Sequence, residues 1–138
     1  MRFAHLLGLF AGLLGISPAW AQTASSGFTV TQVTSGLNKP YGLTVSSDGR
    51  LLVGEYGAKR VVEVNVTSGA VTPYATGFNF PEGLTWKPDG GSPAEGLYVS
   101  DGQTAISGLG RVIHVDPTTR ALSTFATGAA GDNWPFNL

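Results

Sequence analysis

Short apolar segments alternate with turn residues along residues 22–138, and no part of this stretch has the hydrophobic period of an amphipathic helix. The turns are marked by Gly, Pro and the dipeptides Asp48-Gly49 and Asp89-Gly90. The pattern therefore predicts an all-β chain. The expected strands are residues 42–46, 51–55, 60–65, 70–75, 83–87, 97–100, 111–116 and 121–126.

The expected strands belong to a sequence repeat. Residues 40–43 (Pro-Tyr-Gly-Leu) match residues 81–84 (Pro-Glu-Gly-Leu), and a related landmark begins at Pro135. Arg60 and Arg111 begin matching segments that end at a Gly 17 residues further on. Successive repeats are 41 and 51 residues long, and the extra residues of the second fall in two expected loops, where insertions are tolerated.

Each repeat supplies four expected strands, and four strands per about 40 residues is the spacing of β-propeller blades. We expect a partial propeller over residues 22–138, with a first blade at 36–76, a second at 77–127 and the start of a third at 128–138. Residues 28–35 match the fourth strand of a blade and are expected to form an outer strand that pairs with a last blade. Two blades leave sheet faces and edges uncovered, so closing the ring needs missing blades or self-association. A piece of a longer propeller is the preferred interpretation.

The first 21 residues have the features of an export signal. Arg2 supplies the positive charge, residues 6–16 are apolar, and Pro18 ends this run before an Ala-x-Ala cleavage site. The apolar run is well short of the about 20 residues that a transmembrane helix needs. We therefore expect cleavage after Ala21, no membrane span in the mature chain, and a secreted or periplasmic location.

Composition narrows the classes of function. The formal net charge is -1, so no basic surface argues for nucleic acid as a partner. The absence of Cys excludes disulfides, thiolate metal sites and Cys nucleophiles. With 42% hydrophobic and 12% charged residues, the chain is too apolar to be disordered.

The landmarks of each repeat occur in the order Pro-x-Gly-Leu, Asp-Gly, Leu-x-Val and Arg-Val-x-x-Val. This order resembles the NHL-type repeat and the senescence marker protein/gluconolactonase/luciferin-regenerating enzyme family, over residues 28–138. The resemblance implies a six-bladed, TolB-like propeller. It leaves the activity open, because propellers host hydrolases, lyases, dehydrogenases and binding modules.

The first strand of a propeller blade is the innermost, so the residues at its start are expected around the mouth of the central channel. These residues are Tyr41 in the first blade, Glu82 in the second and Phe136 in the third. The resemblance implies that Glu, Asn or Asp at such positions binds Ca²⁺ or Zn²⁺, which makes Glu82 the candidate metal ligand. Carboxylate oxygens suit Ca²⁺. The alternative is a carboxylate that accepts backbone hydrogen bonds.

In an antiparallel meander the first strand starts at the edge where the second strand ends. Glu55 and Asp101, which end the second strands, are therefore candidates for a substrate-binding face at that edge. Asp101 also begins a loop, residues 101–110, that is five residues longer than its counterpart in the first blade. An Asx turn beside Gly102 is the preferred alternative for Asp101.

The lengthened loop before the third blade adds Asp132, Asn133 and Trp134 to the candidate substrate-binding face. Trp134 is either a stacking surface for a sugar-like ligand or a side chain packed between blades. Arg60 and Arg111 recur in both blades, which favours a structural role for them.

Two classes of function follow. The first, implied by the resemblance to the gluconolactonase-like family, is an exported, metal-dependent hydrolase of lactones or sugar-derived esters, with Ca or Zn as cofactor and a small molecule or glycan as ligand. The second is a non-catalytic NHL-like propeller that binds a protein, peptide or glycan. A propeller lyase or a sugar dehydrogenase is a further alternative.

Overall fold

The computed structural model describes residues 25–88, 91–102 and 110–128. Residues 25–31 belong to a separate unit that contains a turn, in which the Phe28 N–H donates to the Ser25 carbonyl oxygen at 3.0 Å. The second unit begins at Gln32 and contains every strand. No described residue is helical, so the described part of the chain has no helix that could cross a membrane.

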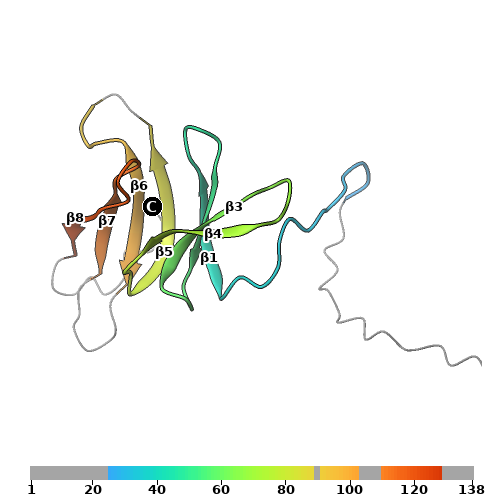
Figure 1. The fold of residues 1–138 in the computed structure, drawn as a ribbon, viewed down its shortest axis with the longest axis horizontal. Helices are drawn as coiled ribbons and strands as arrows, with labels where there is room; N and C mark the ends of the chain where they lie inside the picture. The colour runs from blue at the N-terminus through green and yellow to red at the C-terminus, as the bar shows by residue number, and fades with distance from the viewer. Residues whose placement is uncertain (1–24, 89–90, 103–109, 129–138) are drawn as a thin grey trace, which may run out of the picture. The chain divides into compact units, whose positions relative to one another are not determined.

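The second unit consists of two four-stranded antiparallel sheets, each a simple meander (Figure 1). The first sheet has the order β1-β2-β3-β4 and the second the order β5-β6-β7-β8. All eight strands expected from the sequence are confirmed, with ends that differ by up to three residues. Their bounds are β1 Pro40–Val45, β2 Leu51–Glu55, β3 Arg60–Val64, β4 Val71–Thr76, β5 Phe80–Lys87, β6 Gly96–Gly102, β7 Arg111–Val115 and β8 Leu122–Thr127.

The two sheets repeat each other in structure, and the irregularities of their strand pairing recur at matching positions. The β1–β2 pairing shifts register between Pro40 and Leu43, and the β5–β6 pairing shifts between Pro81 and Leu84. A second shift recurs between β3 and β4 and between β7 and β8. Such β-bulges bend a strand and redirect its side chains. Each Pro-x-Gly-Leu landmark therefore encodes a bulge at the start of a first strand.

The two sheets pack face to face through one apolar cluster. The first sheet contributes Leu52, Val61, Tyr74 and Ala75, with Phe78 from the connection that follows β4. The second sheet contributes alternate residues of β5, β6 and β7, as the two-residue period of a strand requires. These residues are Leu84, Leu97, Val99, Ile113 and Val115, with the half-buried Trp86 packed against them.

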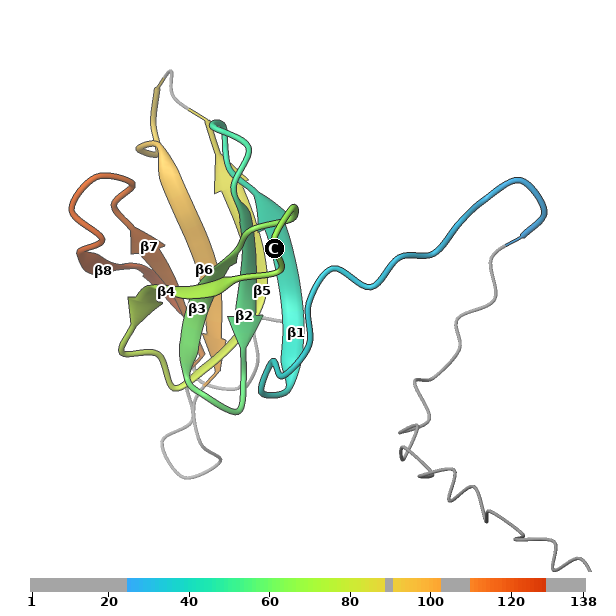
Figure 2. The ribbon, with the colours of Figure 1, turned by 45° about the vertical axis from the view of Figure 1, so that its right-hand side comes forward.

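Glycines allow the first strands of the two sheets, β1 and β5, to lie side by side (Figure 2). A Cβ atom on Gly42 would clash with the carbonyl oxygen of Glu82. A Cβ atom on Gly54 would lie 2.9 Å from Leu84 Cδ1 and 3.2 Å from the Pro81 carbonyl oxygen. The backbones thus approach more closely than any larger residue would permit.

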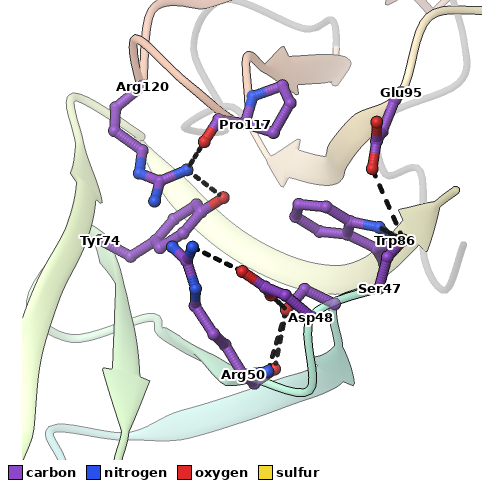
Figure 3. A network of polar contacts seen from close by, with 9 residues as sticks. Ser47, Asp48, Arg50, Tyr74, Trp86, Glu95, Pro117 and Arg120 are labelled. Atoms are coloured by element: carbon purple, nitrogen blue, oxygen red, sulfur yellow. Dashed lines mark hydrogen bonds and ion pairs between the residues drawn. The ribbon is translucent and has the colours of Figure 1, made fainter. Parts of the chain in front are cut away.

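Polar contacts join the sheets at the edge where the β1–β2 and β7–β8 turns meet (Figure 3). The Arg120 guanidinium donates to Tyr74 Oη at 2.8 Å and lies 4.0 Å from the centre of the Tyr74 ring. Trp86 Nε1 donates to Ser47 Oγ at 2.7 Å, also between the sheets.

Residues 28–35, expected to form an outer strand, lie outside any strand in the structure. The expected partner of this segment would belong to a last blade, which is not among the described strands. The outer strand therefore stays a prediction. Thr34 in this segment donates through Oγ1 to the Gly69 carbonyl oxygen at 2.8 Å.

Substitution of Gly42 by Ala tests the close approach of β1 and β5. Because the new methyl group meets backbone rather than a flexible side chain, the sheets must move apart, and we expect a loss of about 2–3 kcal/mol in the free energy of unfolding. Urea denaturation measures this loss. The control Thr72→Ala, at an exposed position of β4, should change stability by no more than about 0.5 kcal/mol. Equal effects of the two substitutions would contradict the packing argument.

Candidate functional site

The start of each first strand lies beside the end of the second strand, as the meander predicts. Pro40 pairs with Glu55, and Pro81 pairs with Asp101. The structure thus places the sequence candidates of each sheet together at one edge, opposite the edge of the polar contacts in Figure 3. This edge is the candidate site.

Glu55 is 1% exposed, and both of its carboxylate oxygens have partners. Oε1 accepts from the Asn38 N–H at 2.6 Å, in the segment that leads into β1. Oε2 accepts from Arg60 Nε at 2.5 Å, at the start of β3. Glu55 therefore connects the segment before the first strand to the start of the third.

Asp101 makes the corresponding contacts in the second sheet and is fully buried. Oδ1 accepts from the N–H groups of Asn79 and Phe80, at 2.8 and 2.7 Å. Oδ2 accepts from Arg111, at 3.0 Å from Nε and 2.8 Å from Nη2. The Asx-turn alternative for Asp101 would use the N–H of residue 103, which lies outside the described residues.

The two carboxylates and their arginines form a repeated pair, Glu55–Arg60 and Asp101–Arg111. In each repeat this ion pair explains why an Arg stands at the start of the third strand. The pairs agree with the structural role that the sequence favoured for Arg60 and Arg111. The sequence did not show that Glu55 and Asp101 are the partners, because the contact joins positions five and ten residues apart across a loop of variable length. In both sheets each carboxylate oxygen accepts at least one hydrogen bond from the protein itself.

Glu82 lies in the β5 bulge and differs from these two carboxylates. It is only 4% exposed, and its Oε2 is a buried oxygen without a hydrogen-bond partner among the described residues. The backbone N–H of Gly83, the extra residue of the bulge, has its hydrogen-bond partner in Ser100. It donates to Ser100 Oγ at 2.7 Å. Ser100 thus supports the backbone beside Glu82, while Glu82 Oε2 has no hydrogen-bond partner among the described residues. In the first sheet the corresponding bulge residue is Tyr41, which is 64% exposed.

Burial raises the pKa of Glu82 above the usual range of a glutamate, and the negative charge of Asp101 raises that pKa further. Both effects penalise the ionised form. A proton or a cation beside Glu82 would relieve the penalty.

Aromatic and cationic side chains that the sequence analysis missed also lie at this edge. Tyr56, in the β2–β3 turn, stacks on Phe80 at the start of β5, with ring centres 4.8 Å apart. Lys59 Nζ lies 5.4 Å from the centre of the same ring. The turn of one sheet is thus held on the first strand of the other. The sequence analysis compared positions within one repeat, so it could not reveal contacts that join two repeats.

Part of the candidate site falls outside the described residues. Asp132, Asn133, Trp134 and Phe136 lie there, as do residues 103–109 of the loop that begins at Asp101. Among the residues that the structure does describe, no three His, Cys, Asp or Glu side chains are grouped to hold a metal ion.

Comparisons with known proteins identify no family for this chain. No protein-family model matches it, and no curated protein matches it. The resemblance to the NHL-type repeat and to the gluconolactonase-like family therefore stays a prediction from the repeat landmarks.

Removal of Arg111 tests the buried pair in the second sheet. Arg111→Met leaves the fully buried Asp101 charge without its cationic partner, and we expect a loss of about 3 kcal/mol in the free energy of unfolding. Arg50→Met is the matched control, since Arg50 pairs with Asp48 at 36% and 51% side-chain exposure and should cost about 0–1 kcal/mol. Urea denaturation compares the two variants. Similar losses would mean that Asp101 does not depend on Arg111.

The raised pKa of Glu82 predicts how stability varies with pH when divalent metals are removed by a chelator. The folded state keeps the Glu82 proton to a higher pH than the unfolded state does. The stability that the protonated Glu82 contributes is therefore complete below the pKa of Glu82 in the unfolded chain. It is lost as the pH rises through the pKa of Glu82 in the folded protein. We expect Glu82→Gln to raise the urea midpoint at neutral pH and to leave it nearly unchanged in acid. A variant less stable than the wild type at neutral pH would contradict the burial argument.

Proposed function

We propose that this chain forms blades of an exported propeller that hydrolyses a lactone or a sugar-derived ester, with Glu82 as one ligand of a divalent metal at the channel mouth. The observation that carries the proposal is the buried Glu82 Oε2 without a partner among the described residues. The two meanders with repeated bulges support the propeller part. The export part depends on the signal features of residues 1–21.

Glu82 fits a metal ligand better than either neighbouring carboxylate does. An ionised carboxylate that is buried without a partner is strongly unfavourable, so a bound cation would explain its position. Glu55 and Asp101 are poor ligands, because both oxygens of each already accept hydrogen bonds from backbone and Arg groups. The Asp101 charge nevertheless favours a cation at Glu82 through its field.

A metal here needs more ligands than Glu82, since Ca²⁺ takes about six to eight oxygens. Asp132 and Asn133, expected on the same face, are the candidates within this chain, and further blades would supply others. When bound, a divalent cation would polarise the ester carbonyl and lower the pKa of a water molecule. The role of Glu82 is to hold the cation at the bulge, where the Ser100–Gly83 contact fixes the backbone.

A non-catalytic binding protein is the second candidate. The raised pKa of Glu82 favours it, because a protonated carboxyl group can donate a hydrogen bond to a ligand oxygen without any metal. Binding on this basis would weaken as the pH rises and would not respond to a chelator.

Metal-dependent stabilisation of the exported protein tests the first candidate. Ca²⁺ and Zn²⁺ are titrated separately while the thermal midpoint is followed, and saturating metal at about 100 times its Kd should add about 2.7 kcal/mol of stability. Glu82→Gln should abolish the shift. Glu63→Gln, a change of the same chemistry on β3, is the control and should keep it.

Hydrolysis of simple lactones is followed in parallel by proton release, with and without a chelator. A metal-induced shift that is equal in the wild type and in Glu82→Gln would refute the metal role of Glu82. Lactone hydrolysis that survives the chelator unchanged would refute the metal-dependent mechanism. Metal binding without hydrolysis would favour the non-catalytic candidate.

A further inference from the structure

Two consecutive residues of β6, Ser100 and Asp101, hold the backbone on both sides of Glu82. Asp101 Oδ1 accepts from two N–H groups in the segment that precedes Glu82, at 2.8 and 2.7 Å. Ser100 Oγ accepts from the N–H of Gly83, directly after Glu82, at 2.7 Å. Both β6 side chains are fully buried, so these hydrogen bonds lie in a low-dielectric interior, where they are stronger than in water.

The first sheet lacks this arrangement at its own bulge. Gly54 takes the place of Ser100 in the repeat and has no side chain that could reach the bulge. Tyr41, which takes the place of Glu82, is 64% exposed, whereas Glu82 is 4% exposed. The serine hydroxyl therefore occurs in the sheet whose bulge carries a buried carboxylate, and it is absent from the sheet whose bulge residue is exposed.

The geometry of the bulge explains how Ser100 can act on Glu82. In the β5–β6 pairing two residues, Glu82 and Gly83, oppose Ser100 alone, and the extra residue of such a bulge is left out of the strand ladder. Ser100 Oγ accepts from the Gly83 N–H and also donates to the Gly83 carbonyl oxygen at 3.4 Å. The peptide that carries this N–H is planar, so holding it fixes one of the two free backbone torsions of Glu82. This torsion helps to set where the Glu82 side chain leaves the backbone.

We propose that Ser100 is a positioning residue for the Glu82 carboxyl group. No described residue donates to Glu82 Oε2, so the place of this oxygen depends on the backbone that carries the side chain. The inference rests on the proposed function for the metal. It adds that the affinity of Glu82 for a divalent cation depends on a hydroxyl group that acts through the backbone. Groups that orient a metal ligand in this way typically change the affinity about 10- to 100-fold when they are removed.

Metal affinity tests the proposal with variants that separate the hydroxyl group from stability. The Kd for Ca²⁺ and for Zn²⁺ is measured on the exported protein from the shift of its thermal midpoint. Ser100→Ala should weaken binding about 10- to 100-fold. Ser100→Thr keeps the hydroxyl group and should restore most of the affinity, even where its extra methyl group lowers stability. Val99→Ala, at the neighbouring buried position of β6, is the matched control: it lowers stability and should leave the Kd unchanged.

Amide hydrogen exchange, followed by NMR, gives a second readout that needs no metal. In Ser100→Ala the Gly83 N–H loses its acceptor, so its exchange should become about tenfold faster relative to the ladder N–H groups between β6 and β7. Val99→Ala should leave this ratio unchanged, because it removes packing and no hydrogen bond. The ratio separates a local loss at the bulge from a general loss of stability.

The outcomes separate this inference from the proposed function. Equal Kd values in the wild type and in Ser100→Ala, equal weakening in Val99→Ala, or an unchanged exchange ratio for Gly83 would overturn the positioning role. A wild type that binds neither metal would refute the metal role of Glu82 alone. In that case the NMR signal of the Glu82 carboxyl carbon decides. It should move in Ser100→Ala and stay in Val99→Ala, and an unmoved signal in Ser100→Ala would overturn the positioning role.

Discussion

The structure depends on the close approach of the first strands of its two sheets, β1 and β5. Gly42 lets the β1 backbone reach the carbonyl group of Glu82, and Gly54 makes room for Leu84 from the second sheet. With the backbones this close, alternate residues of the second sheet can interdigitate with the first in one apolar cluster. The position of Glu82, buried at the boundary, follows from this approach.

The three carboxylates at the candidate site, Glu55, Glu82 and Asp101, differ in role because their hydrogen-bond partners differ. Glu55 and Asp101 accept backbone and Arg hydrogen bonds and hold the segment before each first strand to the start of the third. Glu82, which lies in the β5 bulge and feels the charge of Asp101, has a buried oxygen without such a partner in the described part of the chain. The burial of Glu82 thus carries an energetic cost that the described part of the fold does not offset.

The sequence by itself determined the all-β class, the eight strands and the repeat, because apolar alternation and turn residues are local signals that recur in register. It also placed Tyr41, Glu55, Glu82 and Asp101 at one edge, since a meander fixes which strand ends meet. Only the tertiary structure decided their environments. The pairing of Asp101 with Arg111, the stacking of Tyr56 on Phe80 and the burial of Glu82 depend on loops and on the neighbouring sheet, which no spacing within a repeat encodes.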